Sequence, residues 1–282
     1  MAFKIPVEDR VPTYAGRVKL TPVSGETNMY DMVRADMPIT EGTPINKALF
    51  DNKAYTLTSD VTVYVSTSGS NTNGSGDLDA PFRTIQAAID ALPKNMDGYT
   101  ATVNITAGTY DERVVCRGFI GGKLVIGITS QAVIIRGLEI DACSHVEVNI
   151  GTISWGGIAG DALLSVKNGS RVFIPNDLTL SGGDNNIGGI YAQRGSVVSA
   201  ARYHTIVINN CLSVAAAATM CGVLTFATVT GSGNFVGLST SMGGLITYET
   251  NTLGSDFGDN ADTGGRIQTG GGVSALADAS VE

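Results

Sequence analysis

The segment Ser144-His145-Val146-Glu147-Val148 belongs to a pattern that recurs along the chain. Each copy begins with Gly or Ser and carries apolar residues at its third and fifth positions. The six copies are Gly122–Ile126, Ser144–Val148, Ser170–Ile174, Ser196–Ala200, Gly222–Phe226 and Gly244–Tyr248. Their first residues are 22, 26, 26, 26 and 22 positions apart. Each interval fits one coil of a β-solenoid, which holds three short strands and three turns.

The alternation inside these copies predicts two columns of buried side chains, because successive side chains of a strand point to opposite faces. The first column is Leu124, Val146, Val172, Val198, Leu224 and Ile246, and the second is Ile126, Val148, Ile174, Ala200, Phe226 and Tyr248. Each buried aliphatic side chain stabilises the fold by roughly 1.5–3 kcal/mol. A shift of one residue would bury His145, Glu147 and Arg171 instead, so the register is well specified.

The composition also favours an all-β chain. Hydrophobic residues make up 43% of the 282 residues and charged residues 16%, so we expect a buried core and not general disorder. Glycines separate short runs rich in Val, Ile and Thr, which is typical of short strands joined by tight turns. The predicted fold is therefore a parallel β-helix.

One helix is expected close to the start of the solenoid. Phe82, Ile85, Ile89 and Leu92 share one helical face, and Pro93 stops the run. The end of a solenoid presents an unpaired strand edge. We predict that this capping helix covers it.

Three regions are predicted along the chain. Residues 1–60 hold most of the prolines and should form an extended N-terminal arm, with a short strand from Val18 to Val23. Residues 61–249 form the parallel β-helix, and residues 250–282 are a Gly/Asp-rich C-terminal segment.

The end of the arm carries candidate contacts with another chain. Thr43 can cap a helix, Pro44 fits its first position, and Ile45 and Leu49 lie one turn apart on one face. Phe50 follows them. Because such a short helix is only marginally stable by itself, we expect it to pack against a partner chain.

The net charge excludes two classes of partner. At a formal charge of −8, the chain lacks the clustered Lys and Arg that nucleic acid or anionic lipid would require. Residues 1–10 show no apolar signal-peptide core, and no stretch is long enough to span a membrane. We therefore expect any extracellular role to depend on lysis or on export within a particle.

The run Val63-Tyr64-Val65-Ser66 leads through Ala80-Pro81-Phe82-Arg83-Thr84-Ile85-Gln86-Ala87-Ala88-Ile89 to Ala107-Gly108-Thr109-Tyr110-Asp111-Glu112. These segments resemble the opening of pectate-lyase-like right-handed parallel β-helix proteins. The resemblance implies the hand of the solenoid, its first strand, its capping helix and a structural turn at Asp111 and Glu112. It implies no activity, because this scaffold carries lyases, esterases, hydrolases and inert binding modules.

The arm, from Arg10-Val11-Pro12-Thr13-Tyr14 to Thr43-Pro44-Ile45-Asn46-Lys47-Ala48-Leu49-Phe50-Asp51, is similar to N-terminal segments of phage and prophage tail-fibre and tail-spike-like proteins. In those proteins the N-terminal region anchors a trimer to the virion and a β-solenoid projects outward. The similarity implies a homotrimer and other virion proteins as partners. It also implies a location in the virion after assembly in the bacterial host cytoplasm.

Two carboxylates are candidates for catalysis. Cleavage of a glycan needs a pair about 5–5.5 Å apart for retention or 6.5–9.5 Å for inversion. Glu139 and Asp141 flank inward-facing Ile140, so both point outward from one strand, roughly 7 Å apart at Cα. Lys167 follows Asp141 by one coil, so we favour a solvated ion pair between coils and leave catalysis as the alternative.

No cofactor or metal site is expected. The Asp clusters lack the spacing of a calcium loop and suit turns; they are Asp77 and Asp79, Asp184, and Asp256, Asp259 and Asp262. His145 and His204 have no third residue that would complete a nucleophilic triad.

The cysteines are predicted to be free and mostly buried. Cys116, Cys143, Cys211 and Cys221 have no metal-type spacing. Cys143 and Cys221 occupy equivalent positions three coils apart, roughly 14 Å, which is too far for a disulfide.

Two aromatic residues remain as contact candidates. Trp155 is predicted either to fill a coil corner or to serve as a ligand platform. Phe173 should face outward between Glu147 and Ser199 and is a candidate for contact between chains of an oligomer.

These patterns lead to one expected function and its alternatives. We expect a non-catalytic structural or receptor-binding component of a bacteriophage particle, in a tail fibre, spike, baseplate or head appendage, which could contact a host surface glycan or protein. The alternative is a polysaccharide depolymerase or lyase with its site near Glu139, Asp141 and Lys167. A secreted carbohydrate-binding module is the third class.

Overall fold

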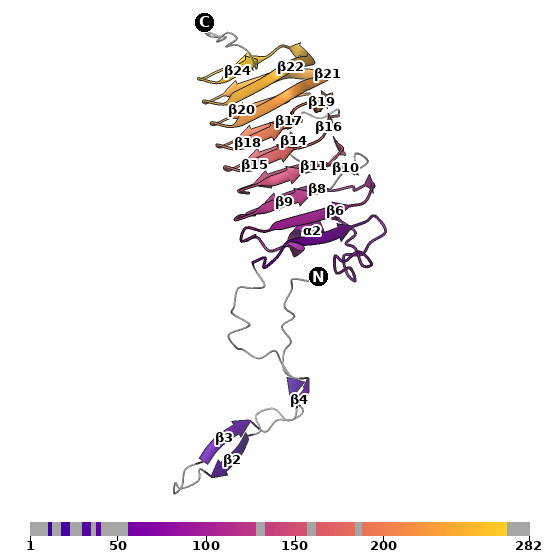
Figure 1. The fold of residues 1–282 in the computed structure, drawn as a ribbon, viewed down its shortest axis with the longest axis vertical. Helices are drawn as coiled ribbons and strands as arrows, with labels where there is room; N and C mark the ends of the chain where they lie inside the picture. Colours follow the sequence, from indigo (N-terminus) through magenta and orange to yellow (C-terminus); the bar gives the residue numbers. More distant parts are fainter. Residues whose placement is uncertain are drawn as a thin grey trace. The chain divides into compact units, whose positions relative to one another are not determined.

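The computed structural model divides the chain into two compact units (Figure 1). One unit comprises Lys4–Ala54, and the other comprises Met1–Phe3 with Tyr55–Glu282. The structure describes residues 11–12, 18–22, 30–34, 38–40, 56–127, 133–156, 162–183 and 188–269.

The described residues of the smaller unit form two antiparallel strand pairs. Strand β1 (Val11–Pro12) pairs with β4 (Pro38–Thr40), and β2 (Val18–Pro22) pairs with β3 (Tyr30–Arg34). The strand predicted from residue 18 is thus confirmed as β2. The contact candidates of the arm lie outside the described residues; they are Thr43, Pro44, Ile45, Leu49 and Phe50.

The larger unit is a parallel β-solenoid of about 6 turns, as the repeat predicts. Its strands lie on three faces. The first face holds β5 (Val61–Val65), β6 (Thr100–Ile105), β9 (Lys123–Ile126), β12 (Val146–Val148), β15 (Arg171–Ile174), β18 (Val197–Ala200) and β24 (Arg266–Thr269). The second holds β7 (Gly108–Thr109), β10 (Val133–Ile135), β13 (Thr152–Ser154), β16 (Leu178–Ser181) and β19 (Thr205–Asn209). The third holds β8 (Arg113–Arg117), β11 (Gly137–Asp141), β14 (Ala162–Lys167), β17 (Gly188–Gln193), β20 (Val214–Thr219) and β23 (Asn260–Ala261).

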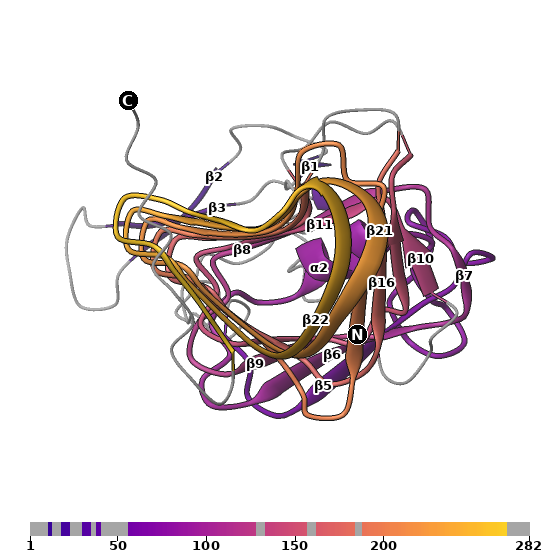
Figure 2. The same ribbon diagram turned by 90° about the horizontal axis from the view of Figure 1, so that it is seen from above.

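Two long strands complete the C-terminal coils. Strands β21 (Val223–Ser241) and β22 (Leu245–Phe257) run round the corners that the earlier coils form with separate strands and loops. Seen from above, these C-terminal coils share one smooth outline, whereas loops of the first coils spread outside it (Figure 2). The right hand of the solenoid stays a prediction, supported by the general preference of parallel strands for right-handed crossovers.

The predicted register is confirmed for the first buried column. Val146 pairs with Leu124 on one side and with Val172 on the other, and the column continues through Val198 and Leu224. These side chains are at most 2% exposed. In the second column, Ile126, Val148, Ile174 and Phe226 are buried, while Ala200 and Tyr248 are half-buried.

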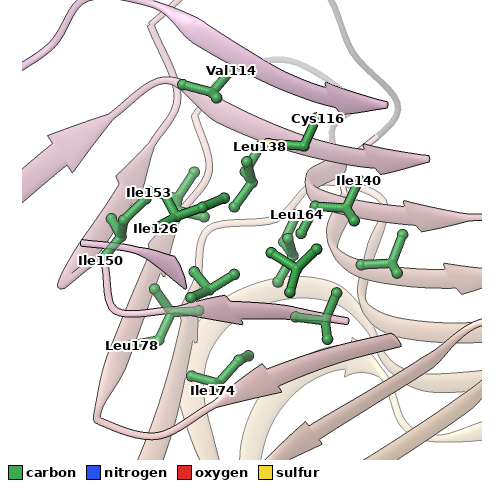
Figure 3. Packing of buried hydrophobic residues seen from close by; sticks show 14 of the residues in the cluster. Val114, Cys116, Ile126, Leu138, Ile140, Ile150, Ile153, Leu164, Ile174 and Leu178 are labelled. Atoms are coloured by element: carbon green, nitrogen blue, oxygen red, sulfur yellow. The ribbon is translucent and has the colours of Figure 1, made fainter. Parts of the chain in front are cut away.

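Further buried columns line the third face. Leu138 pairs with Val114 and Leu164, and Ile140 pairs with Cys116 and Val166. In Figure 3, Val114, Cys116, Leu138, Ile140 and Leu164 lie together with Ile126, Ile150, Ile153, Ile174 and Leu178 in one apolar interior. The stacked coils therefore share one core.

The parallel sheet extends beyond Glu249, the expected end of the solenoid. Strand β22 continues to Phe257, and β24 pairs in parallel with β22, with Ile267 opposite Ile246. The sheet therefore reaches Thr269, so part of the predicted C-terminal segment belongs to the coils. The Gly/Asp-rich composition suits the turns between these strands.

The single helix of the described residues, α2 (Ile85–Ala91), packs against the first coil. Thr84 caps it by accepting a hydrogen bond from the Ala87 N–H at 3.2 Å. The Gln86 amide bonds both the N–H and the C=O of Val115, at 2.7 and 3.1 Å. It thus pairs with backbone groups at the edge of β8, as a covering helix must. Full cover of that end of the solenoid stays a prediction.

The turn between the third and first faces repeats one backbone conformation. Asn168, Arg194, Met220, Met242 and Thr263 have φ between 49° and 56°. In four of these turns the next residue is a glycine with positive φ. In the turn at Met220 the next residue is Cys221, with φ of 62°. A residue with a side chain is strained in this left-handed conformation. The turn at Cys221 therefore lacks the glycine that relieves the strain in the other four turns.

Candidate functional site

Three strands of the third face gather the charged residues around Glu139 and Asp141. Asp141 on β11 pairs with Arg117 on β8 and with Lys167 on β14. Glu139 lies two residues earlier on the same outward face, opposite Val115 and Ser165. The coil register alone therefore brings these side chains together.

Glu139 is surrounded by three cations. Its Oε1 lies 3.3 Å from an Arg117 nitrogen, and its Oε2 lies 3.5 Å from Lys167 Nζ and 3.7 Å from an Arg113 nitrogen. The Glu139 side chain is 18% exposed and that of Arg113 only 9%. Arg113 also donates to the Ala162 carbonyl at 2.9 Å. Such a part-buried carboxylate is held in place by charge on several sides.

Asp141 is held by one cation and one amide. Its Oδ2 lies 2.9 Å from Arg117 Nε, and its Oδ1 accepts from the Asn168 side-chain amide. Asn168 in turn accepts from Arg194 on the next coil at 3.4 Å. The polar contacts thus cross four successive coils along one corner.

This arrangement offers little to acid–base chemistry. All four oxygens of Glu139 and Asp141 already face a cation or an amide. A glycosidic oxygen or a water would therefore have to compete with these contacts for either carboxylate. The contacts suit a structural network between coils.

The sequence reasoning missed two members of this network. Arg117 precedes Asp141 by one coil and lies opposite it, whereas the predicted partner Lys167 lies on the following coil. Arg113 lies on the same strand as Arg117 and faces the same side. The signal that identifies both arginines is the alignment of β11 with β8, the strand of the preceding coil. Lys167 stands opposite Asp141 in the expected register, but its Nζ contacts Glu139, and the cation next to Asp141 is Arg117.

The turn at Asp111 and Glu112 has structural contacts. The Glu112 carboxylate accepts from the backbone N–H groups of Ile85 and Gln86, at 2.7 and 3.0 Å. It therefore serves the otherwise unpaired N–H groups at the start of α2. Asp111 makes an ion pair with Arg136 at 2.6 Å.

The cysteines are free, and three of the four are buried, as predicted. Burial raises the pKa of the Cys116 and Cys143 thiols, and it raises that of Cys211 to about 12. Buried thiols of this kind are poor nucleophiles and poor metal ligands near neutral pH.

The histidines and Trp155 have simple surroundings. His145 is exposed, and His204 Nδ1 lies 3.1 Å from Asp177 at the surface. Trp155 is half-buried against the core, and its ring lies over Gly183, where a Cβ would come within 2.4 Å. This contact favours the corner-filling interpretation of Trp155.

The remaining predictions concern metals, membranes and the outward aromatic residue. Among the described residues, no group of three or more His, Cys, Asp and Glu side chains could hold a metal ion. Within the same residues, no helix has the length and apolarity to cross a bilayer. Phe173 is half-buried between Glu147 and Ser199, in the predicted register.

Comparison of the chain with protein-family models, with curated proteins and with solved structures gave no match.

Proposed function

We propose that the chain is a non-catalytic structural or receptor-binding component of a bacteriophage particle, anchored through residues 1–60. The observation that supports this most is the division of the chain into a small N-terminal unit and a β-solenoid. An attachment unit and a stiff shaft are the two parts that an appendage of a particle needs. A tail fibre, spike, baseplate or head appendage would each use them in this way.

The contacts of the third face support the non-catalytic part of the proposal. Glu139 and Asp141 are engaged by Arg113, Arg117, Lys167 and Asn168. These contacts join neighbouring coils, so they stiffen a shaft. A substrate would have to compete with these contacts before the same carboxylates could take part in hydrolysis.

Incorporation into particles tests the proposal directly. The full chain and a variant lacking residues 1–54 would be expressed in the bacterial host, and released particles would be purified and analysed by mass spectrometry. We expect the full chain in the particle fraction and the truncated chain only in the soluble fraction. Absence of the full chain from particles would reject the proposal, and incorporation of the truncated chain would reject anchoring by the arm.

The proposal includes a homotrimer and other virion proteins as partners. Phe173 is the described residue that we place at a contact between chains, since it is an outward-facing aromatic side chain on the first face. Light scattering should give three times the chain mass, and Phe173→Asp should lower it. Ser199→Asp, at the next position of the same column, is the matched control. A monomeric full chain would contradict this part.

A polysaccharide depolymerase or lyase is the second candidate function. It is favoured by one observation, the two part-buried carboxylates two residues apart on one outward face, next to Lys167. Cleavage of capsular or pectic polysaccharides by the purified chain, lost in Glu139→Gln and Asp141→Asn, would establish it. The absence of cleavage would leave the structural proposal in place.

A further inference from the structure

A small pocket opens at the corner between the first and second faces, away from the charged network. Its volume is about 240 Å³. It lies among the last coils, where β18 ends and where β21 and β22 continue round the corner. The residues that matter for its chemistry are Ala200, Arg202, Thr225, Thr247, Tyr248 and Glu249.

The pocket exists because one buried column loses volume at this point. Ile174 pairs with Ala200, so an alanine follows a large aliphatic residue. The next coils carry Phe226 and Tyr248 at the same position. After Ala200 the chain leaves the sheet, so it does not fill the corner as β21 does. Ala200 and Tyr248 consequently stay half-buried, and their apolar surface lines the hollow.

The rim of the pocket carries a cation and an anion that are close but not hydrogen-bonded. Arg202 Nε lies 3.9 Å from Glu249 Oε1, and their side chains are 79% and 57% exposed. A hydrogen bond requires a shorter distance, so the guanidinium donors and the carboxylate acceptors remain usable by a ligand. A rim with one charge of each sign disfavours a ligand that carries a net charge.

Two hydroxyl groups complete the polar lining. Thr247 Oγ1 donates to Thr225 Oγ1 at 3.1 Å. This bond does not use the proton of the Thr225 hydroxyl, which can be donated to a ligand. The lining therefore combines an aromatic and apolar side with hydroxyl, guanidinium and carboxylate groups.

We propose that this pocket binds one uncharged pyranose ring of a glycan. A pyranose has an apolar C–H surface, which suits Tyr248 and Ala200, and adjacent hydroxyls, which suit Arg202 and Glu249. An anionic ligand would meet Glu249, and a purely apolar one would leave the charged rim without partners. The volume lies below the usual range for drug-sized ligands, which fits a single ring.

The inference takes the receptor-binding part of the proposed function as its premise and names a ligand class for it. The two can fail separately. Particle incorporation tests the virion role without any sugar, and sugar binding is measured on the purified full chain without particles.

Saturation-transfer difference NMR on the full chain tests the pocket. The probes are the methyl glycosides of glucose, galactose, mannose, rhamnose and N-acetylglucosamine at millimolar concentration, with galacturonate as a charged comparison. We expect transfer to the ring C–H protons of at least one neutral glycoside and weaker transfer to galacturonate. No transfer to any neutral probe, or stronger transfer to galacturonate, overturns the proposal.

Variants locate the binding site. Arg202→Ala and Glu249→Gln should each lower the transfer at least about tenfold, the loss expected for one hydrogen bond to a charged group. Both side chains are exposed, so the fold should persist, which circular dichroism would verify. Arg171→Ala is the matched control, since Arg171 is an exposed arginine on the first face away from the pocket. Unchanged transfer in both rim variants, or an equal loss in Arg171→Ala, overturns the assignment.

Discussion

The corner between the third and first faces has opposite character at its two ends. In the earlier coils it carries an ion pair between Arg117 and Asp141, and Lys167, which contacts Glu139. In the later coils the corresponding turn carries Met220 and Met242, which are 44% and 53% exposed. The turn after Lys167 nevertheless has the same positive φ at its first two residues as the turns at Met220 and Met242.

The difference shows that the inward residues specify the fold and that the outward residues do not. The inward columns stay apolar in both regions, and each buried aliphatic side chain contributes roughly 1.5–3 kcal/mol. An exposed ion pair contributes about 0–1 kcal/mol. The outward residues can therefore change from charged to apolar without shifting the register, which leaves them available for partners.

The largest expected effect tests whether both regions depend on the same core. Leu138 and Leu238 belong to one inward column, and both are fully buried. Leu138→Ala and Leu238→Ala should each lower the free energy of unfolding by about 3 kcal/mol. Urea-induced unfolding followed by circular dichroism measures this. A loss below about 1 kcal/mol for Leu238→Ala would show that the later coils are not part of one cooperative core.

A second prediction concerns the charged network alone. Glu139→Gln removes one anionic neighbour of the nearly buried Arg113 guanidinium and should cost about 2 kcal/mol of unfolding free energy. Ser239 occupies the same outward column in the later coils, so Ser239→Ala should be nearly neutral. Equal effects of the two substitutions in urea titrations would contradict the contrast between the regions.

A third prediction uses the exceptional turn of the later coils. Cys221→Gly should raise the free energy of unfolding by about 1 kcal/mol, because it removes a side chain from a left-handed conformation. Gly195→Ala, in the same turn of an earlier coil, should lower it by a similar amount. A Cβ at Gly195 would meet no atom within 4 Å, so backbone strain alone is tested. Thermal unfolding of both variants measures the two changes in stability. If both variants were stabilised, or both destabilised, the prediction would be refuted.

The smallest expected effect depends on pH. The backbone N–H of Thr205, and to a lesser extent His204, lowers the pKa of Asp177 below its usual value. A lowered folded-state pKa stabilises the protein above the unfolded pKa of about 3.9, and this stabilisation is lost as the pH falls through the folded value. Because Asp177 is largely exposed, the advantage of wild type over Asp177→Asn should be a few tenths of a kcal/mol at pH 5.

The advantage should disappear at about pH 2, where both proteins carry an uncharged side chain at this position. Urea titrations at the two pH values measure it. An advantage that grows on acidification would have the wrong sign.

The inner columns could be predicted from the sequence because they repeat at a fixed spacing with period-two alternation. Val146, Val172 and Val198 needed only the register to be placed. The coils beyond Glu249 were not predicted, because Gly, Asn and Asp there suit turns as well as the ends of strands.

The candidate site was predicted only in part. Glu139 and Asp141 were identified, but their partner Arg113 is visible only once the preceding coil is aligned. The pocket near Tyr248 depends on a loss of volume at Ala200 and on a chain that leaves the sheet there. Neither a repeat nor a motif signals such a local departure.

The length of each coil also determines how far the solenoid extends along its axis and how stiff it is. A coil of 26 residues, such as the one from Val146 to Val172, would span roughly 90 Å as an extended strand. Wound into the solenoid, it advances the axis by about 4.8 Å. The hydrogen bonds between coils lie along that axis and act side by side, so bending the rod requires many of them to distort together. Such a construction suits a support that must hold a surface at a fixed angle, more than a tether that must search for it.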